Sequence, residues 1–225
     1  MGSCKGTYFI YRLVNGSSGI FTDNSYLAML DRRACDEAVN PVDEDMKVII
    51  GAGEQCWEGW VPTQREELDL LNEESWARFF QGELADALLC EHVFEHLSLE
   101  EGKQAAAMIY RYLKPGGFIR LAVPDAYFPD EEYQRIVQVG GPGPKDHPAA
   151  DHKVVYNCDL LREVYQEAGF VVKLLEYHDE QGRFHIADWN VDEAPIYRSS
   201  KLDHRNQDGV IKFASLIIDA IKPIS

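Results

Sequence analysis

Two histidines and a glutamate stand close together in the middle of the chain and could do metal or proton chemistry. His92, Glu95 and His96 fit the pattern H-x-x-E-H, the inverted signature of zinc peptidases. On a helix the two histidines would share a face and could bind zinc, with Glu95 as a base. Because no third ligand stands at a convincing position on a later helix, we expect no metal. A metal-dependent reaction that also uses His152 stays open as an alternative.

Other residues suited to chemistry gather in two loop-like stretches of the second half of the chain. His152 follows the breaker-rich residues 140–144 and could remove a proton from a substrate near neutral pH. Residues 178–210 have no clear secondary structure but are rich in aromatic and charged side chains, so we interpret them as a substrate lid. His185 is a second candidate base there.

Four residues are candidates for substrate contacts, namely Tyr156, Trp189, Arg198 and Arg205. The two arginines could clamp a carboxylate or phosphate through paired hydrogen bonds. The competing explanation is that the arginines pair with nearby aspartates (Asp188, Asp192, Asp203 or Asp208) and that Trp189 belongs to the core.

Strands and helices alternate along the chain in a way that predicts how these residues are positioned. The expected strands are 47–50, 60–61, 68–71, 85–90, 118–123, 170–176 and 215–218. The expected helices are 73–80, 98–113 and a third that either Asn157 or Asp159 caps and that runs to Ala168. Ser98 and Glu101 form a capping box at the start of the second helix. This alternation is typical of an α/β protein with a mostly parallel sheet and helices on both faces.

The amino-acid composition limits the kinds of partner that the protein is expected to bind. The 225 residues carry 38 acidic and 22 basic side chains, a net charge of −16, which disfavours nucleic acid. The five cysteines are far apart and form no C-x-x-C pair, so neither a disulfide framework nor a zinc site is indicated. No segment approaches the roughly 20 apolar residues that a membrane span needs. We therefore expect a cytoplasmic protein that binds neither nucleic acid nor membrane.

Three stretches carry a resemblance to a known family: 47–53 with its Gly51-Ala52-Gly53 turn, 86–97 with E-H-x-x-E-H-L, and 113–117 with L-K-P-G-G. Together they resemble the class I S-adenosylmethionine-dependent methyltransferases, in particular small predicted methyltransferases of unassigned substrate with a similar Ala-Val-Pro-Asp at 122–125. The resemblance implies a Rossmann-like, doubly wound sheet of seven strands whose last strand is antiparallel. It also implies S-adenosylmethionine as cofactor, bound at the carboxyl ends of the strands.

The resemblance also implies roles for individual residues. Gly51, Ala52 and Gly53 would let the backbone approach the methionine end of the cofactor, and Glu91 or His92 would line the same pocket. The cofactor's adenosine would be held by Gln64 at the ribose, Asp69 at the adenine amino group and Leu70 on the ring.

Two departures from the family pattern fall in the same region. The acid that normally ends the second strand is missing, although Glu66 or Glu67 could substitute. About eight residues separate the first two strands, too few for an ordinary crossover, so the first crossover helix must be reduced or lost.

These observations lead to one functional hypothesis and one alternative. Residues 1–45 form an arm or cap, and residues 46–225 form a methyltransferase-like domain with a lid at about 178–210. The domain would methylate a small molecule, with His152 or His185 removing a proton and His92 near the methyl group. The alternative is a methyltransferase-like protein that no longer catalyses and serves as a binding or scaffold subunit.

Overall fold

The computed structural model describes residues 45–142, 145, 147–206 and 209–224. The arm or cap expected at residues 1–45 therefore lies, except for its last residue, outside the described residues.

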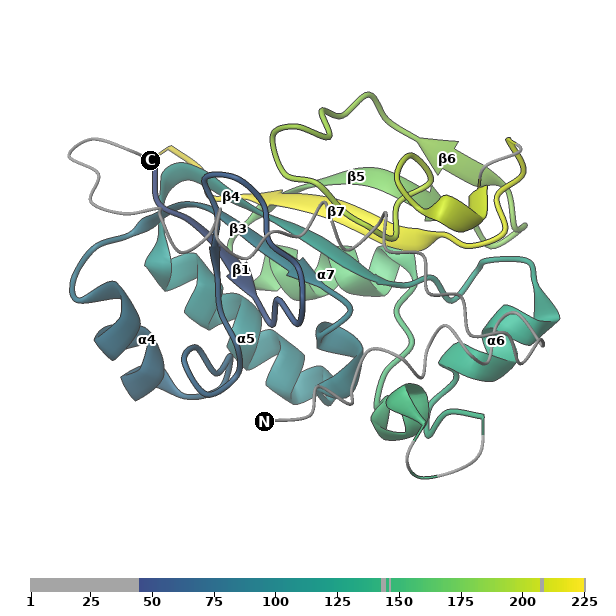
Figure 1. Cartoon of the computed structure of the whole chain (residues 1–225), viewed down its shortest axis with the longest axis horizontal. Helices are drawn as coiled ribbons and strands as arrows, with labels where there is room; N and C mark the ends of the chain where they lie inside the picture. Colours follow the sequence, from purple (N-terminus) through teal and green to yellow (C-terminus); the bar gives the residue numbers. More distant parts are fainter. Residues whose placement is uncertain (1–44, 143–144, 146, 207–208, 225) are drawn as a thin grey trace, which may run out of the picture.

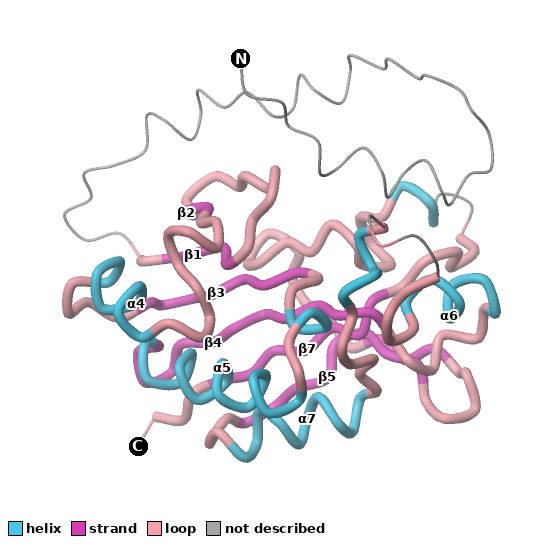
Figure 2. The backbone as a smooth tube through the Cα atoms, turned by 90° about the horizontal axis from the view of Figure 1, so that it is seen from below, coloured by secondary structure: helices cyan, strands magenta, loops and turns pink. Residues whose placement is uncertain are grey.

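A single mixed sheet runs through the molecule, with strand order β2-β1-β3-β4-β7-β5-β6 (Figure 2). Its strands are β1 (Lys47–Ile50), β2 (Val61–Pro62), β3 (Ala85–Glu91), β4 (Leu113–Pro124), β5 (Val171–His178), β6 (Phe184–Ile186) and β7 (Ser215–Ile221). The first four pair in parallel, whereas β7 is antiparallel to both β4 and β5. The prediction of a mostly parallel seven-stranded sheet with an antiparallel last strand is confirmed.

One expected strand does not form, and one strand that was not expected does, so the described sheet still has seven strands. Residues 68–71 are a turn: the backbone carbonyl of Asp69 accepts hydrogen bonds from Trp76 Nε1 at 2.9 Å and Ser75 Oγ at 3.3 Å. Those side chains satisfy the carbonyl that a neighbouring strand would otherwise pair. The extra strand is β6, which pairs with β5 at the opposite edge of the sheet.

Three helices cover one face of the sheet: α4 (Glu73–Phe80), α5 (Leu99–Tyr112) and α7 (Cys158–Glu167) (Figure 1). Each begins where the sequence predicts, because Asn72, Ser98 and Asn157 accept hydrogen bonds from the first-turn amides, and Ser98 and Glu101 form the expected capping box. Their apolar faces pack on the inward side chains of the strands.

A fourth helix, α6 (Glu131–Val137), follows β4 and was not predicted, although Asp130 caps it and two glutamates fill its first turn. The described residues also contain three short 3-10 turns: η1 (Phe94–His96), η2 (Pro148–Asp151) and η3 (His204–Asn206).

In the described part of the chain, a loop covers the second face of the sheet where helices were expected. Trp189, Ala194 and Ile196 are buried there against side chains that include Ile49 and Leu89. The connection from β1 to β2 contains turns and no helix, as its length predicted. The middle of the segment that was interpreted as a lid is therefore part of the hydrophobic core.

A buried arginine ties this loop to the sheet. Arg120 of β4 pairs with both carboxylate oxygens of Asp219 of β7, at 2.7 and 2.8 Å. Its Nη1 donates to the backbone carbonyls of Asn190 and Ala194, and its guanidinium lies 4.9 Å from the ring of Trp189. All sides of the buried guanidinium are therefore occupied by acceptors or an aromatic ring.

The cysteine expectation needs a correction. Cys90 and Cys158 are buried free thiols, but Cys56, between β1 and β2, is disulfide-bonded, which the cysteine spacing did not indicate. Within the described ranges, no helix has the length and apolar character needed to cross a bilayer.

Candidate active site

The chain brings several polar residues to one edge of the sheet. The parallel strands β1 and β4 end there just before Gly51 and Asp125, and β3 ends there at Glu91. Strand β5 ends there at His178, and antiparallel β7 begins there at Ser215. Open α/β sheets bind their ligands at this carboxyl edge. The direction of each strand, rather than nearness in sequence, assembles the site.

In the glycine turn after β1, the side chain of Val93 occupies the space next to Gly51, whereas the space next to Gly53 is open in the described structure. Gly51 has φ +64°, and a Cβ placed on it would lie 2.7 Å from Cγ2 of Val93. Gly53 has φ +57°, and no heavy atom of the described residues lies within 4 Å of the equivalent Cβ position. Ala52 between them is buried and donates to the carbonyl of Thr63 at 2.9 Å. A ligand can therefore approach the backbone at Gly53.

Two buried polar atoms near this turn, Oε1 of Gln55 and Nε1 of Trp57, have no hydrogen-bond partner among the residues that the structure describes. The Trp57 ring lies 4.7 Å from the ring of Tyr197. Buried polar atoms are usually paired, so an acceptor and a donor that lack partners suit a polar ligand. These two residues, beside the open Gly53, fit the polar end of a cofactor.

The residues expected to hold the adenosine part are partly engaged within the protein. Gln64 donates from Nε2 to the carbonyl of Gly53 at 2.8 Å. The Asp69 carboxylate accepts hydrogen bonds from Leu71 N at 2.9 Å and from Arg65 Nε at 3.0 Å. The side chain of Leu70 is buried in the hydrophobic core that also contains residues of α4 and α5. Gln64 thus supports the glycine turn.

Glu91 at the end of β3 is buried and anchors the loop above it. Its carboxylate accepts hydrogen bonds from Gln55 Nε2 and Tyr197 N at 2.9 Å and from Arg198 N at 3.0 Å. Burial nevertheless raises the pKa of Glu91 above its usual range. Through Glu91, the loop from the second face reaches the carboxyl edge.

His92 adopts a backbone conformation rare for a residue with a side chain, φ +55°. Its Nε2 lies 2.8 Å from Oγ of Ser215 and its Nδ1 lies 3.3 Å from Oε1 of Glu95. Burial lowers the pKa of His92 well below its usual value. Because His92 precedes the 3-10 turn η1, it does not share a helix face with His96, and the zinc-peptidase arrangement is not formed.

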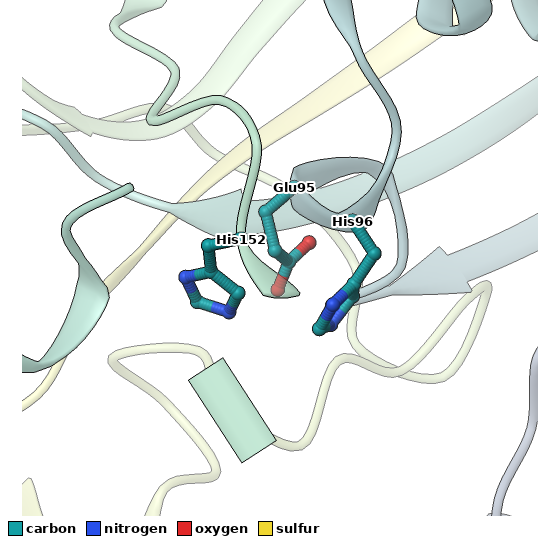
Figure 3. A group of neighbouring side chains, drawn as sticks. All are labelled: Glu95, His96 and His152. Carbon is teal, nitrogen blue, oxygen red and sulfur yellow. The ribbon is translucent and has the colours of Figure 1, made fainter. Parts of the chain in front are cut away.

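His152, by contrast, comes next to Glu95 and His96 (Figure 3). One donor atom from each of the three residues lies within 4.8 Å of the others. The backbone amides of Lys153 and Val154 donate to the carbonyl of Glu95 at 2.7 and 3.3 Å, which fixes the two segments together. Burial raises the pKa of Glu95 to about 8 and lowers the pKa of His152.

Sequence reasoning missed a buried pair at the same edge, Asp125 and His178. Oδ2 of Asp125 accepts from the backbone N and from Nδ1 of His178, at 2.8 and 2.9 Å. Asp125 ends the Ala-Val-Pro-Asp stretch, which was a usable signal, but its partner lies 53 residues away.

A pocket with a volume of about 500 Å³ opens beside this pair. It is lined by Phe128, Pro129, Asp130, His178, Phe184, Val210, Ile211 and Lys212. A chain of ring contacts connects its wall to the end of β3: His178 to Phe128, then Tyr133, Phe213 and His92, with centroid separations of 5.0, 4.7, 5.2 and 6.1 Å. The pocket and the end of β3 therefore belong to one packed unit.

The expected substrate residues divide into two groups. Tyr156 and Trp189 are buried in the two cores, and Trp189 donates from Nε1 to Glu176 at 3.0 Å. Arg198 meets Glu91 through its backbone. Arg205 pairs with Asp203, as the competing explanation held, and its guanidinium lies 3.6 Å from the ring of Phe213.

His185, the other candidate base, lies on the β5–β6 hairpin and is partly buried. Its Nε2 lies 2.8 Å from Oδ2 of Asp179, and its ring stacks on Tyr177 with centroids 4.8 Å apart. The pocket beside His178 does not include it.

Comparison with known proteins points to one fold. Residues 59–121 match the family model described as a methyltransferase domain. No curated protein matches the sequence.

Among solved structures, an S-adenosylmethionine-dependent methyltransferase from Archaeoglobus fulgidus is 16% identical, covers 96% of this chain and 100% of its own, and has a TM-score of 0.47. A chain of the complex that the Haloferax volcanii Trm112 methyltransferase activator forms with a methyltransferase is also 16% identical, with 89% and 92% covered and a TM-score of 0.47. At these values the structural likenesses carry no argument about activity.

The family match runs from the residues before β2 into β4 and includes β3, whose end lies at the carboxyl edge, and it indicates S-adenosylmethionine as the cofactor. The strand order agrees with it, since the antiparallel β7 lies between β4 and β5. The chain therefore carries the fold of the class I S-adenosylmethionine-dependent methyltransferases.

Proposed function

We propose that this protein transfers a methyl group from S-adenosylmethionine to a hydroxyl or amine of a small molecule bound in the pocket beside His178. The observation that carries the proposal is a pocket of about 500 Å³ whose wall includes His178, a histidine hydrogen-bonded to the buried Asp125 behind it. That volume lies within the roughly 300–1,000 Å³ of small-molecule sites.

The cofactor would be held by the glycine turn and the loop after it. Gly53 leaves its backbone open, and Gln55 and Trp57 offer an unpaired acceptor and donor. When bound, S-adenosylmethionine supplies an electrophilic methyl group on a sulfonium sulfur. The protein's contribution is to orient an acceptor atom and to take up its proton.

His178 is suited to take up that proton. Because the Asp125 carboxylate accepts from Nδ1, the neutral imidazole carries its hydrogen on Nδ1 and leaves Nε2 as the basic atom. Asp125 is buried and also accepts the backbone amide of His178, so the ring cannot turn away without breaking a second bond. We therefore assign the role of base to His178 rather than to His152 or His185, because those two residues do not line this pocket.

The pocket wall supports a neutral, partly apolar substrate. Phe128, Phe184 and Ile211 give an apolar surface, whereas Asp130 and Lys212 place one charge of each sign at the rim. Small-molecule sites combine such apolar walls with a few polar groups that fix orientation.

A binding or scaffold role is the second candidate. The observation that favours it is that Gln64 and Glu91, expected at the cofactor, are engaged in hydrogen bonds within the protein. Such a subunit would keep the fold and bind a partner without binding S-adenosylmethionine.

Calorimetry on the full chain distinguishes the two. We expect S-adenosylmethionine and S-adenosylhomocysteine to bind with one site per chain, and Gly53→Val to weaken both. Transfer of labelled methyl should then appear in a small-molecule extract and not in added RNA or protein. Absence of binding by either compound would reject the enzyme, and transfer to RNA or protein would reject the small-molecule substrate.

A further inference from the structure

Glu95, His96 and His152 form a cluster that the proposed reaction does not use. Glu95 and His96 come from η1, and His152 comes from the segment after η2, so two distant parts of the chain meet at one point (Figure 3). Imidazole nitrogens with a carboxylate oxygen are ligands typical of zinc and other first-row divalent metals.

The two histidines are already held in the orientation that a metal ligand needs. His152 Nδ1 lies 3.0 Å from the carbonyl of Val137, and His96 Nδ1 lies 2.7 Å from Oδ1 of Asp151. Because these acceptors take the hydrogen of Nδ1, each ring is left with Nε2 as its free donor atom. Metal-binding histidines are usually held in this way by a carbonyl or carboxylate on the other nitrogen.

Glu95 supplies an independent observation. Its side chain is 1% exposed, and within the described part of the chain its buried Oε2 has no hydrogen-bond partner. His92 lies 3.3 Å from the other oxygen and itself binds Ser215, so the carboxylate is held from one side only. A buried carboxylate oxygen without a partner costs free energy, which a bound cation would offset.

The spacing suits a single ion after a small movement. The three donor atoms lie within 4.8 Å of one another, whereas two bonds of about 2.1 Å reach at most about 4.2 Å. His96 is about one-third exposed, so its ring can turn inward without disturbing the core.

We propose that Glu95, His96 and His152 bind one divalent transition-metal ion, zinc or a close relative, through Oε2 of the glutamate and Nε2 of each histidine. Three protein ligands leave at least one position open to water or to an oxygen atom of a substrate, as in catalytic rather than structural zinc sites. The site does not depend on methyl transfer and is tested without it.

The test is titration of the full chain, first stripped with a chelator, with Co²⁺ followed by visible absorption and then with Zn²⁺ followed by calorimetry. We expect one ion per chain and a d–d band that Zn²⁺ removes. His96→Ala, His152→Ala and Glu95→Gln should each weaken binding by at least about 100-fold, and Asp151→Asn by about 10- to 100-fold.

A matched control is His185→Ala, since His185 also pairs with a carboxylate, Asp179, but lies outside the cluster. It should bind the ion like the wild type. Circular dichroism checks that each variant is folded. Because His96 is partly exposed, we expect His96→Ala to disturb the fold least. Absence of saturable binding in the wild type, or unchanged binding in a folded His96→Ala, would overturn the proposal.

Discussion

The carboxylate of Asp125 accepts two hydrogen bonds from His178, one from the backbone N at 2.8 Å and one from Nδ1 at 2.9 Å. The first bond joins the end of β4 to the end of β5, and the second sets which ring nitrogen carries the hydrogen. One buried side chain therefore stabilises the sheet edge and fixes the tautomer of His178 that its proposed role as a base requires.

Replacing His178 by glutamine should lower kcat by about 10²- to 10⁴-fold, because general-base catalysis contributes about that much. The KM for S-adenosylmethionine should stay near the wild-type value, because His178 lies at the substrate pocket. Steady-state kinetics with an identified acceptor measures both. His204→Gln, on the exposed turn η3, is the control and should react like the wild type. Equal kcat in both variants would reject His178 as the base.

The two glycines after β1 should respond differently to alanine. Gly51→Ala should lower the free energy of unfolding by about 1–3 kcal/mol, because it combines a positive φ with a Cβ 2.7 Å from Val93. Gly53→Ala carries only the backbone strain, about 1–2 kcal/mol, but its methyl group enters the space left for the cofactor.

Denaturant unfolding and calorimetry with S-adenosylmethionine separate the two effects. Gly53→Ala should lose more cofactor affinity than its change in stability explains. If it binds S-adenosylmethionine as tightly as the wild type does, the open space at Gly53 is not part of the cofactor site.

Arg120→Met should lower the free energy of unfolding by about 3–5 kcal/mol, because it leaves the Asp219 carboxylate without its partner. The double variant Arg120→Met/Asp219→Leu should recover part of that loss, since no uncompensated charge remains. Arg135→Met breaks an exposed pair with Glu132 and should cost at most about 1 kcal/mol. Urea unfolding followed by tryptophan fluorescence measures all three, and an equal loss for Arg120→Met and Arg135→Met would contradict the argument.

The stability of the fold should fall with rising pH through Glu176, whose pKa burial raises above 4.5. A carboxyl group that binds its proton more tightly when folded contributes stability below pH 4.5 and loses it as the pH passes the raised pKa. Glutamine does not titrate in this range. The Glu176→Gln variant should therefore gain stability relative to the wild type as the pH rises from 4.5 to 7. Urea unfolding across that range checks it, and parallel pH profiles for the two proteins would contradict it.

Much of the fold could be predicted because its signals are local. The capping box of α5 and the apolar runs of β1 and β3 each lie within one element, and all three were placed correctly. Residues 68–71 show the limit, because their apolar run suits a strand, but contacts with α4 decide the backbone pairing.

The site was harder to predict because it depends on pairings between distant residues. Asp125 and His178 lie 53 positions apart, and neither position alone distinguishes a base from a strand end. Likewise, the burial of Trp189 follows from a loop that replaces a helical layer, and aromatic content alone suggested a lid. The H-x-x-E-H pattern does not form the zinc-peptidase arrangement, since His92 has a positive φ and lies outside the turn that contains His96.

The loop that covers the second face of the sheet also delivers Tyr197 and Arg198 to Glu91. In evolutionary terms, this segment is constrained twice, because any substitution that redirects its contacts at the carboxyl edge also disturbs the core that it closes. Divergence in substrate choice should therefore concentrate in residues 210–212, which line the pocket from a separate segment. Related chains that have acquired new acceptors would be recognised by changes there, with the loop preserved.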